Sequence, residues 1–218
     1  MITTRHLRNL ARQGDADAQF RLGYRLAFAR HCVRPAWSQA VHWWSLAARQ
    51  EHLRAQFYLA TCYDGGQGVR KDLCRAMKLY RSAAGKGHVE AQFNLALGFR
   101  DGAGVRQDSR AAAVWFRRAA ECGDAGAQSD FGYCLYEGYG ISRDRRQAVK
   151  WYRRAAQQGL LRAQFNLGLC YLYGTGVKKN LRAAQLWLGR AASRRHKEAR
   201  ETLRRHWPSN KRIHRTPR

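Results

Sequence analysis

One segment of the chain occurs twice in nearly the same form, and this repetition constrains the fold more than any other feature of the sequence. The stretch that begins at Trp115 reads WFRRAAECGDAGAQ, and the stretch that begins 36 residues later, at Trp151, reads WYRRAAQQGLLRAQ. Such a period is typical of solenoids, in which each repeat buries its apolar face only against its neighbours. The dipeptide Ala-Gln marks five repeats, with its glutamine spaced by 37 and then three times by 36 residues. These glutamines are Gln19, Gln56, Gln92, Gln128 and Gln164.

Each repeat begins with an amphipathic helix, here called helix A. In the third repeat Ala91, Phe93, Leu95 and Phe99 are apolar residues at helical spacing. A pair of glycines follows helix A in four repeats. The first glycine can adopt the left-handed conformation in which many helices end, and the second allows the chain to reverse. The pairs are Gly66 with Gly68, Gly102 with Gly104, Gly138 with Gly140, and Gly174 with Gly176.

A second helix, helix B, is predicted to begin soon after each glycine pair. Its first N–H groups need acceptors, and short polar side chains stand at the right place to supply them. These residues are Asp72, Asp108, Asp144 and Asn180. Helix B then carries alanines and a pair of large residues, such as Trp115 with Phe116. Packing of rings against alanines predicts that the tryptophans belong to the core. A platform on which nucleic-acid bases stack is the alternative.

The repeat frame predicts a single domain over nearly the whole chain. Residues 1–207 are expected to form an all-α solenoid, with repeats near 14–50, 51–86, 87–122, 123–158 and 159–194. Residues 3–13 and 196–207 are predicted capping helices, which solenoids need to cover their exposed ends. Residues 208–218 form a basic tail with too little apolar content to fold.

The pattern A-Q-F-N-L-G-x-x-Y-x-x-G-x-G-V-x-x-D-x-x-x-A-x-x-W-x-x-x-A-A-x-x-G resembles the Sel-1-like repeat, a relative of the tetratricopeptide repeat. Four repeats match it specifically, whereas the first contains AFARHCVRPAW, lacks the glycine pair and has one extra residue. The resemblance implies a right-handed superhelix of antiparallel helix pairs that acts as an adaptor for other proteins. Members of this family serve in signalling, secretion, envelope assembly and protein quality control.

The cysteines separate this chain from one branch of that family. Some exported, cysteine-rich members carry regularly spaced disulfides in every repeat and have been linked to β-lactam binding. Cys62, Cys134 and Cys170 share one helix A position, but no second cysteine follows at a constant offset. We therefore expect reduced thiols that pack as small apolar groups, and a hydrolase-like activity is only a remote alternative.

No catalytic, cofactor-binding or metal-binding site is predicted. Eight histidines are scattered without an H-E-x-x-H motif or a zinc-like Cys/His spacing. His31 and Cys32 adjoin in the first repeat, but neighbours on an irregular loop seldom have the geometry of a nucleophile and its base. The glycine pairs recur in one register, which favours helix capping over phosphate binding. We expect no enzymatic activity and no small-molecule substrate.

Two surfaces remain as candidate binding sites. By analogy with related solenoids, the A helices line the concave face, and a mixture of tyrosine, asparagine, arginine and leucine there is typical of protein binding, with a merely solvated groove as the alternative. The predicted concave residues are Arg21, Tyr24, Tyr58, Asn94, Leu97, Asp130, Tyr133, Asn166 and Leu169. On the B helices, cations in repeat register are predicted to form a basic ladder on the convex side. This ladder consists of Lys78, Arg81, Arg117, Arg118, Lys150, Arg153, Arg154 and Arg190.

The charge of the chain favours acidic partners. Lys and Arg number 41 against 15 Asp and Glu, which gives a formal net charge of +26. The leading hypothesis is a scaffold that binds an acidic or amphipathic segment of another protein, and the alternative is binding of RNA or DNA through the basic ladder and the tail. A compositional bias toward arginine without a dedicated ligand also accounts for the charge. We expect no membrane partner and a cytoplasmic location, because neither a signal peptide nor a membrane-spanning run is evident.

Overall fold

A computed structural model describes residues 4–28 and 35–208, and within these ranges the chain forms twelve α-helices and no strand. The predicted all-α repeat fold is therefore confirmed. The region that holds His31 and Cys32, and the tail from residue 209 onward, lie outside the described residues. The helices are α1 (Thr4–Arg12), α2 (Ala16–Phe28), α3 (Trp37–Arg49), α4 (Leu53–Gly65), α5 (Leu73–Gly85), α6 (Val89–Asp101), α7 (Ser109–Glu121), α8 (Ala125–Glu137), α9 (Arg145–Gln157), α10 (Leu161–Tyr173), α11 (Leu181–Ser193) and α12 (Lys197–His206).

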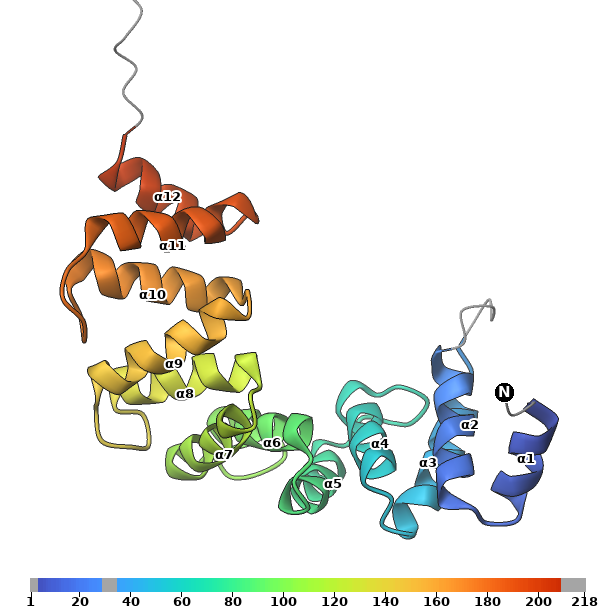
Figure 1. Cartoon of the computed structure of the whole chain (residues 1–218). Coiled ribbons are helices and arrows are strands. Elements are labelled where there is room, and N and C mark those ends of the chain that lie inside the picture. The colour runs from blue at the N-terminus through green and yellow to red at the C-terminus, as the bar shows by residue number, and fades with distance from the viewer. Residues whose placement is uncertain (1–3, 29–34, 209–218) are drawn as a thin grey trace, which may run out of the picture. The chain divides into compact units, whose positions relative to one another are not determined.

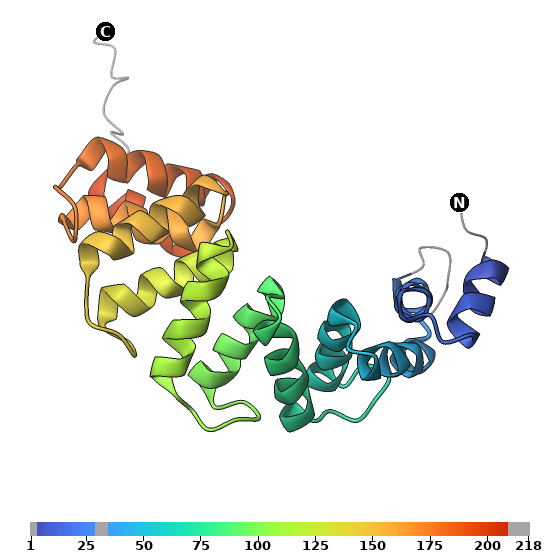
Figure 2. The same ribbon diagram turned by 60° about the horizontal axis from the view of Figure 1, so that its bottom comes forward.

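The chain divides into two compact units, residues 1–122 and 123–218. In the first unit α1 packs on α2, and the hairpins α2–α3, α4–α5 and α6–α7 follow one another along the chain. In the second unit the hairpins are α8–α9 and α10–α11, and α12 packs on α11. Within each unit, successive hairpins lie side by side (Figures 1 and 2). The even-numbered helices from α2 to α10 are the predicted A helices, and the odd-numbered helices from α3 to α11 are the B helices.

The predicted boundaries between helix A and helix B are confirmed where the glycine pair is present. Helix α6 ends at Gly102, which adopts the left-handed conformation with φ 69°, and Asp108 accepts a hydrogen bond from the Ala111 N–H at 3.0 Å to start α7. Left-handed Gly66, Gly138 and Gly174 end the other A helices that carry the pair, and Asp72, Asp144 and Asn180 cap the B helices that follow.

Three second glycines, Gly68, Gly104 and Gly176, have a further role that the sequence does not reveal. Gly68 adopts φ 70°, and a Cβ atom built there would lie 2.5 Å from the backbone carbonyl carbon of Trp37, at the start of the preceding B helix. A side chain at Gly104 would likewise overlap the backbone of Leu73. The loop of one repeat therefore lies directly on the first turn of helix B in the repeat before it, and a side chain here would push the two apart.

The core consists of large side chains of helix B packed against small residues of helix A. A Cβ atom at Gly132 would lie 2.8 Å from Cε1 of Tyr152, so the absence of a side chain there makes room for the tyrosine ring. The fully buried position is the second member of each large pair, and it is occupied by Trp44, Tyr80, Phe116, Tyr152 and Leu188. The prediction that the tryptophans are core residues is therefore right in full for Trp44, whereas Trp115 is only partly buried and packs against the core of the first unit. The first members of the later pairs, Trp115, Trp151 and Trp187, are half-buried.

Candidate functional site

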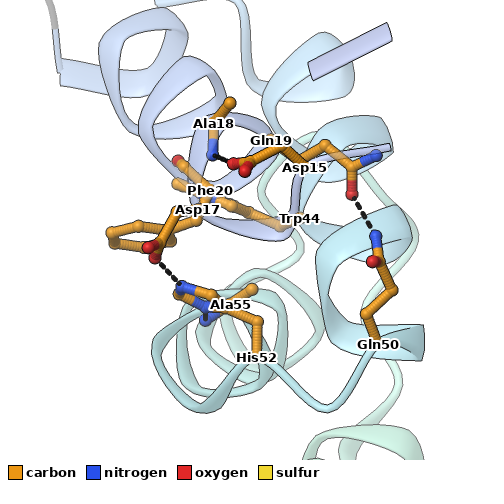
Figure 3. Close-up of polar contacts among 9 residues, drawn as sticks. All are labelled: Asp15, Asp17, Ala18, Gln19, Phe20, Trp44, Gln50, His52 and Ala55. Atoms are coloured by element: carbon orange, nitrogen blue, oxygen red, sulfur yellow. Dashed lines mark hydrogen bonds and ion pairs between the residues drawn. The ribbon is translucent and has the colours of Figure 1, made fainter. Parts of the chain in front are cut away.

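Histidines at the starts of helices connect neighbouring A helices, which carry the predicted concave residues. In the junction between α2 and α4, the Nδ1 atom of His52 accepts a hydrogen bond from the Ala55 N–H at 3.1 Å, and its Nε2 atom lies 3.0 Å from Asp17 (Figure 3). The same ring stacks on Phe20 with centroids 4.8 Å apart. His52 therefore caps one helix and binds the previous A helix at the same time.

The same arrangement occurs in other repeats. His88 caps α6 and stacks on Phe57 at 4.6 Å, and His196 caps α12 and stacks on Phe165 at 4.7 Å. Sequence analysis missed these caps because histidine is not among the usual N-cap residues. The signal that could have revealed them is their register: His52 and His88 stand four residues before the repeat glutamines Gln56 and Gln92, and His196 stands at the same place before Arg200.

Buried glutamines connect the helices beneath this surface. The Oε1 atom of Gln19 accepts a hydrogen bond from Nε2 of Gln50 at 2.9 Å, as Figure 3 shows. The indole N–H of Trp44 donates to the backbone carbonyl of Phe20 at 3.2 Å. These contacts fix α2 against α3, so the rings on the outer side of α2 are held in place.

Aromatic rings gather on a partly solvent-exposed side of α2 and α4. We call the group of Arg21, Tyr24, Phe28, Arg54 and Tyr58 the aromatic patch. The ring of Tyr24 contacts that of Phe28 at 4.8 Å and that of Tyr58 edge-on at 5.6 Å. Tyr58 in turn stacks on the buried Trp44 at 5.2 Å. Tyr24 is 41% exposed and Phe28 is 46% exposed, so two rings of a rigid cluster face the solvent.

Arginines surround these rings. The guanidinium of Arg54 lies 4.9 Å from the centroid of Phe20, and both Arg21 and Arg54 are exposed. Burial, followed by the neighbouring Tyr24, raises the pKa of Tyr58, so its hydroxyl is neutral at physiological pH and can donate a hydrogen bond. A hollow of about 450 Å³ adjoins the patch. It is lined by Leu7, Phe20, Arg21, Tyr24, Arg25 and Arg54.

In the second unit, three of the predicted concave residues also meet around one hollow. Tyr133 of α8 and Asn166 and Leu169 of α10 line a pocket of about 160 Å³, and Tyr133 is 50% exposed. Cys170 lines the same pocket, but burial raises the pKa of its thiol to about 11. The thiol is therefore protonated at physiological pH and is a poor nucleophile.

The remaining predicted concave residues differ in their environment. Asp130 is 7% exposed, and its carboxylate forms an ion pair with Arg162 at 2.6 Å, so it serves contacts within the unit. Asn94 and Leu97 are half-buried on α6 and line none of the hollows described above. The structure thus brings Arg21, Tyr24 and Tyr58 together in one unit, and Tyr133, Asn166 and Leu169 together in the other.

The cations of the predicted basic ladder are mostly engaged within the chain. Arg118, Arg154 and Arg190 lie over the rings of the tryptophans three residues earlier, at 4.5, 4.5 and 4.7 Å from the centroids. Of the other ladder residues, Arg117 pairs with Glu121 at 2.8 Å, Arg153 donates to the Tyr171 hydroxyl at 2.8 Å, and Arg81 lies 5.6 Å from the centre of the Phe99 ring. Lys78 and Lys150 are exposed. Cation–π contacts leave the charges of these arginines in place.

Two classes of feature are absent from the part of the chain that the structure describes. None of the helices between residues 4 and 208, leaving out 29–34, is both long and apolar enough to cross a bilayer. The same residues contain no group of three histidine, cysteine or acidic side chains that could hold a metal ion.

Comparison with known proteins identifies similar sequences and folds. The Sel1 repeat family matches the chain at residues 16–52, 53–88, 89–124, 125–160 and 161–196. A protective antigen present in uropathogenic Escherichia coli strains, which displays an SLR fold, is similar with 35% identity and a TM-score of 0.84 over 89% of this chain. The match covers 41% of that antigen, so the present chain spans less than half of its length.

A Sel1 repeat protein from Oxalobacter formigenes is similar with 30% identity and a TM-score of 0.80, over 93% of this chain and 78% of the other. A putative Sel1 repeat protein from Klebsiella pneumoniae has 20% identity and a TM-score of 0.54 over 91% of this chain and 96% of its own, and it supports the fold alone. A comparison with curated protein sequences found no match.

Proposed function

The chain belongs to the Sel1 repeat family, whose members are generally scaffolds for protein–protein interaction, and from this premise we propose that it is a non-enzymatic scaffold that binds an acidic or amphipathic segment of another protein. The observation that carries the proposal is the aromatic patch on α2 and α4. The exposed thiols of Cys74 and Cys122 are compatible with a reducing compartment, and we place the protein in the cytosol.

The rings of the patch are suited to anchor a partner. Tyr24 and Phe28 present large apolar areas to the solvent, and their contacts with each other and with Tyr58 hold them in position before any partner arrives. Rings that are fixed beforehand lose little conformational freedom on binding, and for this reason tyrosine is enriched among the residues that dominate interface energies.

The arginines favour a segment that carries carboxylates. Arg21 and Arg54 are exposed beside the rings, and each guanidinium can hold a carboxylate through two parallel hydrogen bonds. The formal charge of +26 adds a long-range attraction for acidic partners, which raises the association rate more than the final affinity. A segment with an aromatic or leucine anchor next to acidic residues fits both the rings and the arginines.

The second unit offers a smaller contact area of the same type. Tyr133 stands exposed beside the pocket that Asn166 and Leu169 line, and this pocket of about 160 Å³ has room for one small apolar side chain. Tyr24, Tyr58, Tyr133, Asn166 and Leu169 all belong to A helices, the helices that we propose bind the partner.

The proposal is tested by capture of interacting proteins on the immobilised full-length chain, after nuclease treatment and at roughly physiological salt, where exposed charges are screened beyond about 8 Å. The wild type is compared with Tyr24→Ala and with Tyr173→Ala, which removes a tyrosine that is 62% exposed on α10 and lies outside the patch. A captured protein is then purified and its Kd is measured against all three forms.

We expect Tyr24→Ala to weaken binding roughly tenfold or more, as for a ring at the centre of an interface, and Tyr173→Ala to leave the Kd within about twofold. Equal affinity of the Tyr24→Ala variant and the wild type would contradict the proposal. Loss of all captured material on nuclease treatment would also count against it.

A further inference from the structure

A basic hollow lies among α5, α6 and the start of α7, and none of its lining residues belongs to the aromatic patch. The hollow has a volume of about 590 Å³. Arg81 lies over the half-buried ring of Phe99, 5.6 Å from its centroid, and the exposed Arg106 and Arg110 also line the hollow. We call Arg81, Phe99, Arg106 and Arg110 notch 1.

The acidic residue of this hollow does not pair with the arginines. Asp108 is the one carboxylate among the lining residues, and it accepts the hydrogen bond from the Ala111 N–H that starts α7. Arg106 and Arg110 form no ion pair with any carboxylate of the described residues. The three cations of notch 1 are therefore available to an external anion.

The same types of residue stand in register two repeats later, in the second unit. Arg153 takes the place of Arg81, and its guanidinium donates to the hydroxyl of Tyr171, which takes the place of Phe99, at 2.8 Å. Lys178 and Arg182 replace Arg106 and Arg110, and both are exposed. Together with the exposed Lys179, these residues form notch 2. The acidic residue is missing here, because Asn180 caps α11 in place of Asp108.

The composition is not a general property of the repeat. At the corresponding positions 36 residues earlier, Ser45 of the first repeat replaces the helix B arginine and Cys74 of the second repeat replaces Arg110. Arginine-rich composition alone does not explain why a ring and three cations share the hollow of notch 1, or why a ring and cations recur in the same register 72 residues later.

We propose that notch 1 and notch 2 bind single-stranded nucleic acid, with the cations on phosphates and an unpaired base stacked on the ring and the guanidinium that contacts it. Stacking on a ring or a guanidinium combined with cations on the backbone is the usual way to bind single strands without sequence preference. The hollow of about 590 Å³ has room for a base. A base inside a duplex is already stacked on both faces, so it cannot stack on the ring of the notch. A single strand supplies both a phosphate for the cations of one notch and an unpaired base for its ring, whereas the phosphate of a phosphoserine peptide comes without a base. This surface extends the function beyond protein binding.

The test is fluorescence anisotropy with the full-length chain and a labelled, unstructured oligonucleotide of roughly 20 nucleotides, at about 50 and 150 mM salt. Two double variants each remove two cations from one notch: Arg106→Gln with Arg110→Gln, and Lys178→Gln with Arg182→Gln. The matched control is Arg8→Gln with Arg12→Gln, which removes two exposed cations of α1. A fourth form, Tyr24→Ala, separates this surface from the aromatic patch.

We expect each notch variant to weaken binding about fivefold or more and to reduce the slope of log affinity against log salt by roughly one to two. The control pair and Tyr24→Ala are expected to stay within about twofold of the wild type. The inference is overturned by an equal loss in the control pair, by duplex that binds as tightly as the single strand, by a phosphopeptide that competes at lower concentration than the oligonucleotide, or by the absence of binding at the lower salt concentration.

Discussion

The side-chain amide of Gln19 donates a hydrogen bond through Nε2 to the backbone carbonyl of Ala11, at 3.1 Å, although the two residues belong to different helices. The pattern recurs eight residues apart in later repeats, from Gln92 to Ala84 and from Gln164 to Ala156, at 3.2 Å each. Each acceptor lies near the end of one helix and also accepts a backbone N–H, from Gly14, Gly87 and Gly159 respectively, so the glutamine of another helix adds a second hydrogen bond to the same carbonyl. Successive repeats are thus joined by a buried polar contact.

The glutamines differ in whether the side-chain oxygen, Oε1, also forms a hydrogen bond. This difference predicts that their substitution will lower the stability by unequal amounts. Oε1 of Gln19 accepts from Gln50, whereas Oε1 of Gln164 is buried without a hydrogen-bond partner among the described residues. Gln19→Met is therefore expected to lower the free energy of unfolding by about 1–3 kcal/mol, and Gln164→Met by less. Urea denaturation of both variants measures this, and a larger loss for Gln164→Met would contradict the assignment.

Two glycines of the fifth repeat, one in the glycine pair and one within helix B, are expected to change stability in opposite directions when they are replaced by alanine. Gly176 adopts φ 72°, and a side chain there would overlap the backbone of Arg145, so Gly176→Ala should destabilise by more than about 1 kcal/mol. Gly189 lies within α11, where an added Cβ meets no atom within 4 Å, so Gly189→Ala should stabilise by up to about 1 kcal/mol. Thermal unfolding of the two variants checks the signs, and two shifts of Tm in the same direction would refute the packing of this loop.

The histidine caps predict a pH dependence of stability. Burial lowers the pKa of His88 below its ordinary 6.5, an effect that Glu90 opposes and Arg54 reinforces. As pH falls below about 6.5, the unfolded chain takes up a proton at this histidine that the folded chain does not, so the free energy of unfolding should fall until the folded pKa is passed. The protonated ring would also lose the Nδ1 lone pair that accepts from the Ala91 N–H.

Asparagine at position 88 keeps an N-cap acceptor but cannot titrate, so His88→Asn should flatten the slope of stability against pH between about 6.5 and 5. His42→Gln is the control, because His42 is exposed on α3 and caps no helix. Urea unfolding at several pH values makes the comparison, and an unchanged slope in His88→Asn would show that this cap is not the source.

The exposed and the buried cysteines are expected to differ in their reactivity toward an alkylating reagent. Cys62 and Cys170 are buried, and burial raises their thiol pKa values to about 12 and about 11, whereas Cys74 and Cys122 are exposed. An alkylating reagent at neutral pH should label Cys74 and Cys122 in the folded protein and reach the other two only after unfolding. Peptide mapping by mass spectrometry resolves the sites, and early labelling of Cys62 would be inconsistent with the core described here.

Local chemistry explains why the helix boundaries were predictable from the sequence. Gly102 and Asp108 satisfy needs that arise within a few residues, a left-handed end and an acceptor for free N–H groups, and these needs do not depend on the rest of the fold. The same glycine and capping residues recur at the repeat period, so a chance occurrence at one boundary is not mistaken for a helix end.

Contacts between helices were harder to predict. The role of Gln19 depends on Ala11 of another helix, and the cap at His52 depends on Phe20 and Asp17 of the preceding helix A. Trp115 was assigned to the core from its register, but its side chain is only half-buried, and the guanidinium of Arg118 lies over its ring. In the candidate site, the sequence predicted Tyr24 and Tyr58 from their positions five residues after Gln19 and two residues after Gln56. It did not predict Phe28, which contacts Tyr24 one turn along α2, or Arg54, which contacts Phe20 through the packing of α4 against α2.

Site-specific photocrosslinking tests the central claim, that A helices bind a protein partner, most directly. A photoreactive phenylalanine analogue replaces Tyr24 in one form of the protein and Val114 in another, a residue that is 51% exposed on helix B of the third repeat. The account predicts a discrete crosslinked protein from position 24, competed by an excess of the unlabelled chain, and none from position 114. A crosslink to the same protein from position 114, with none from position 24, would contradict it.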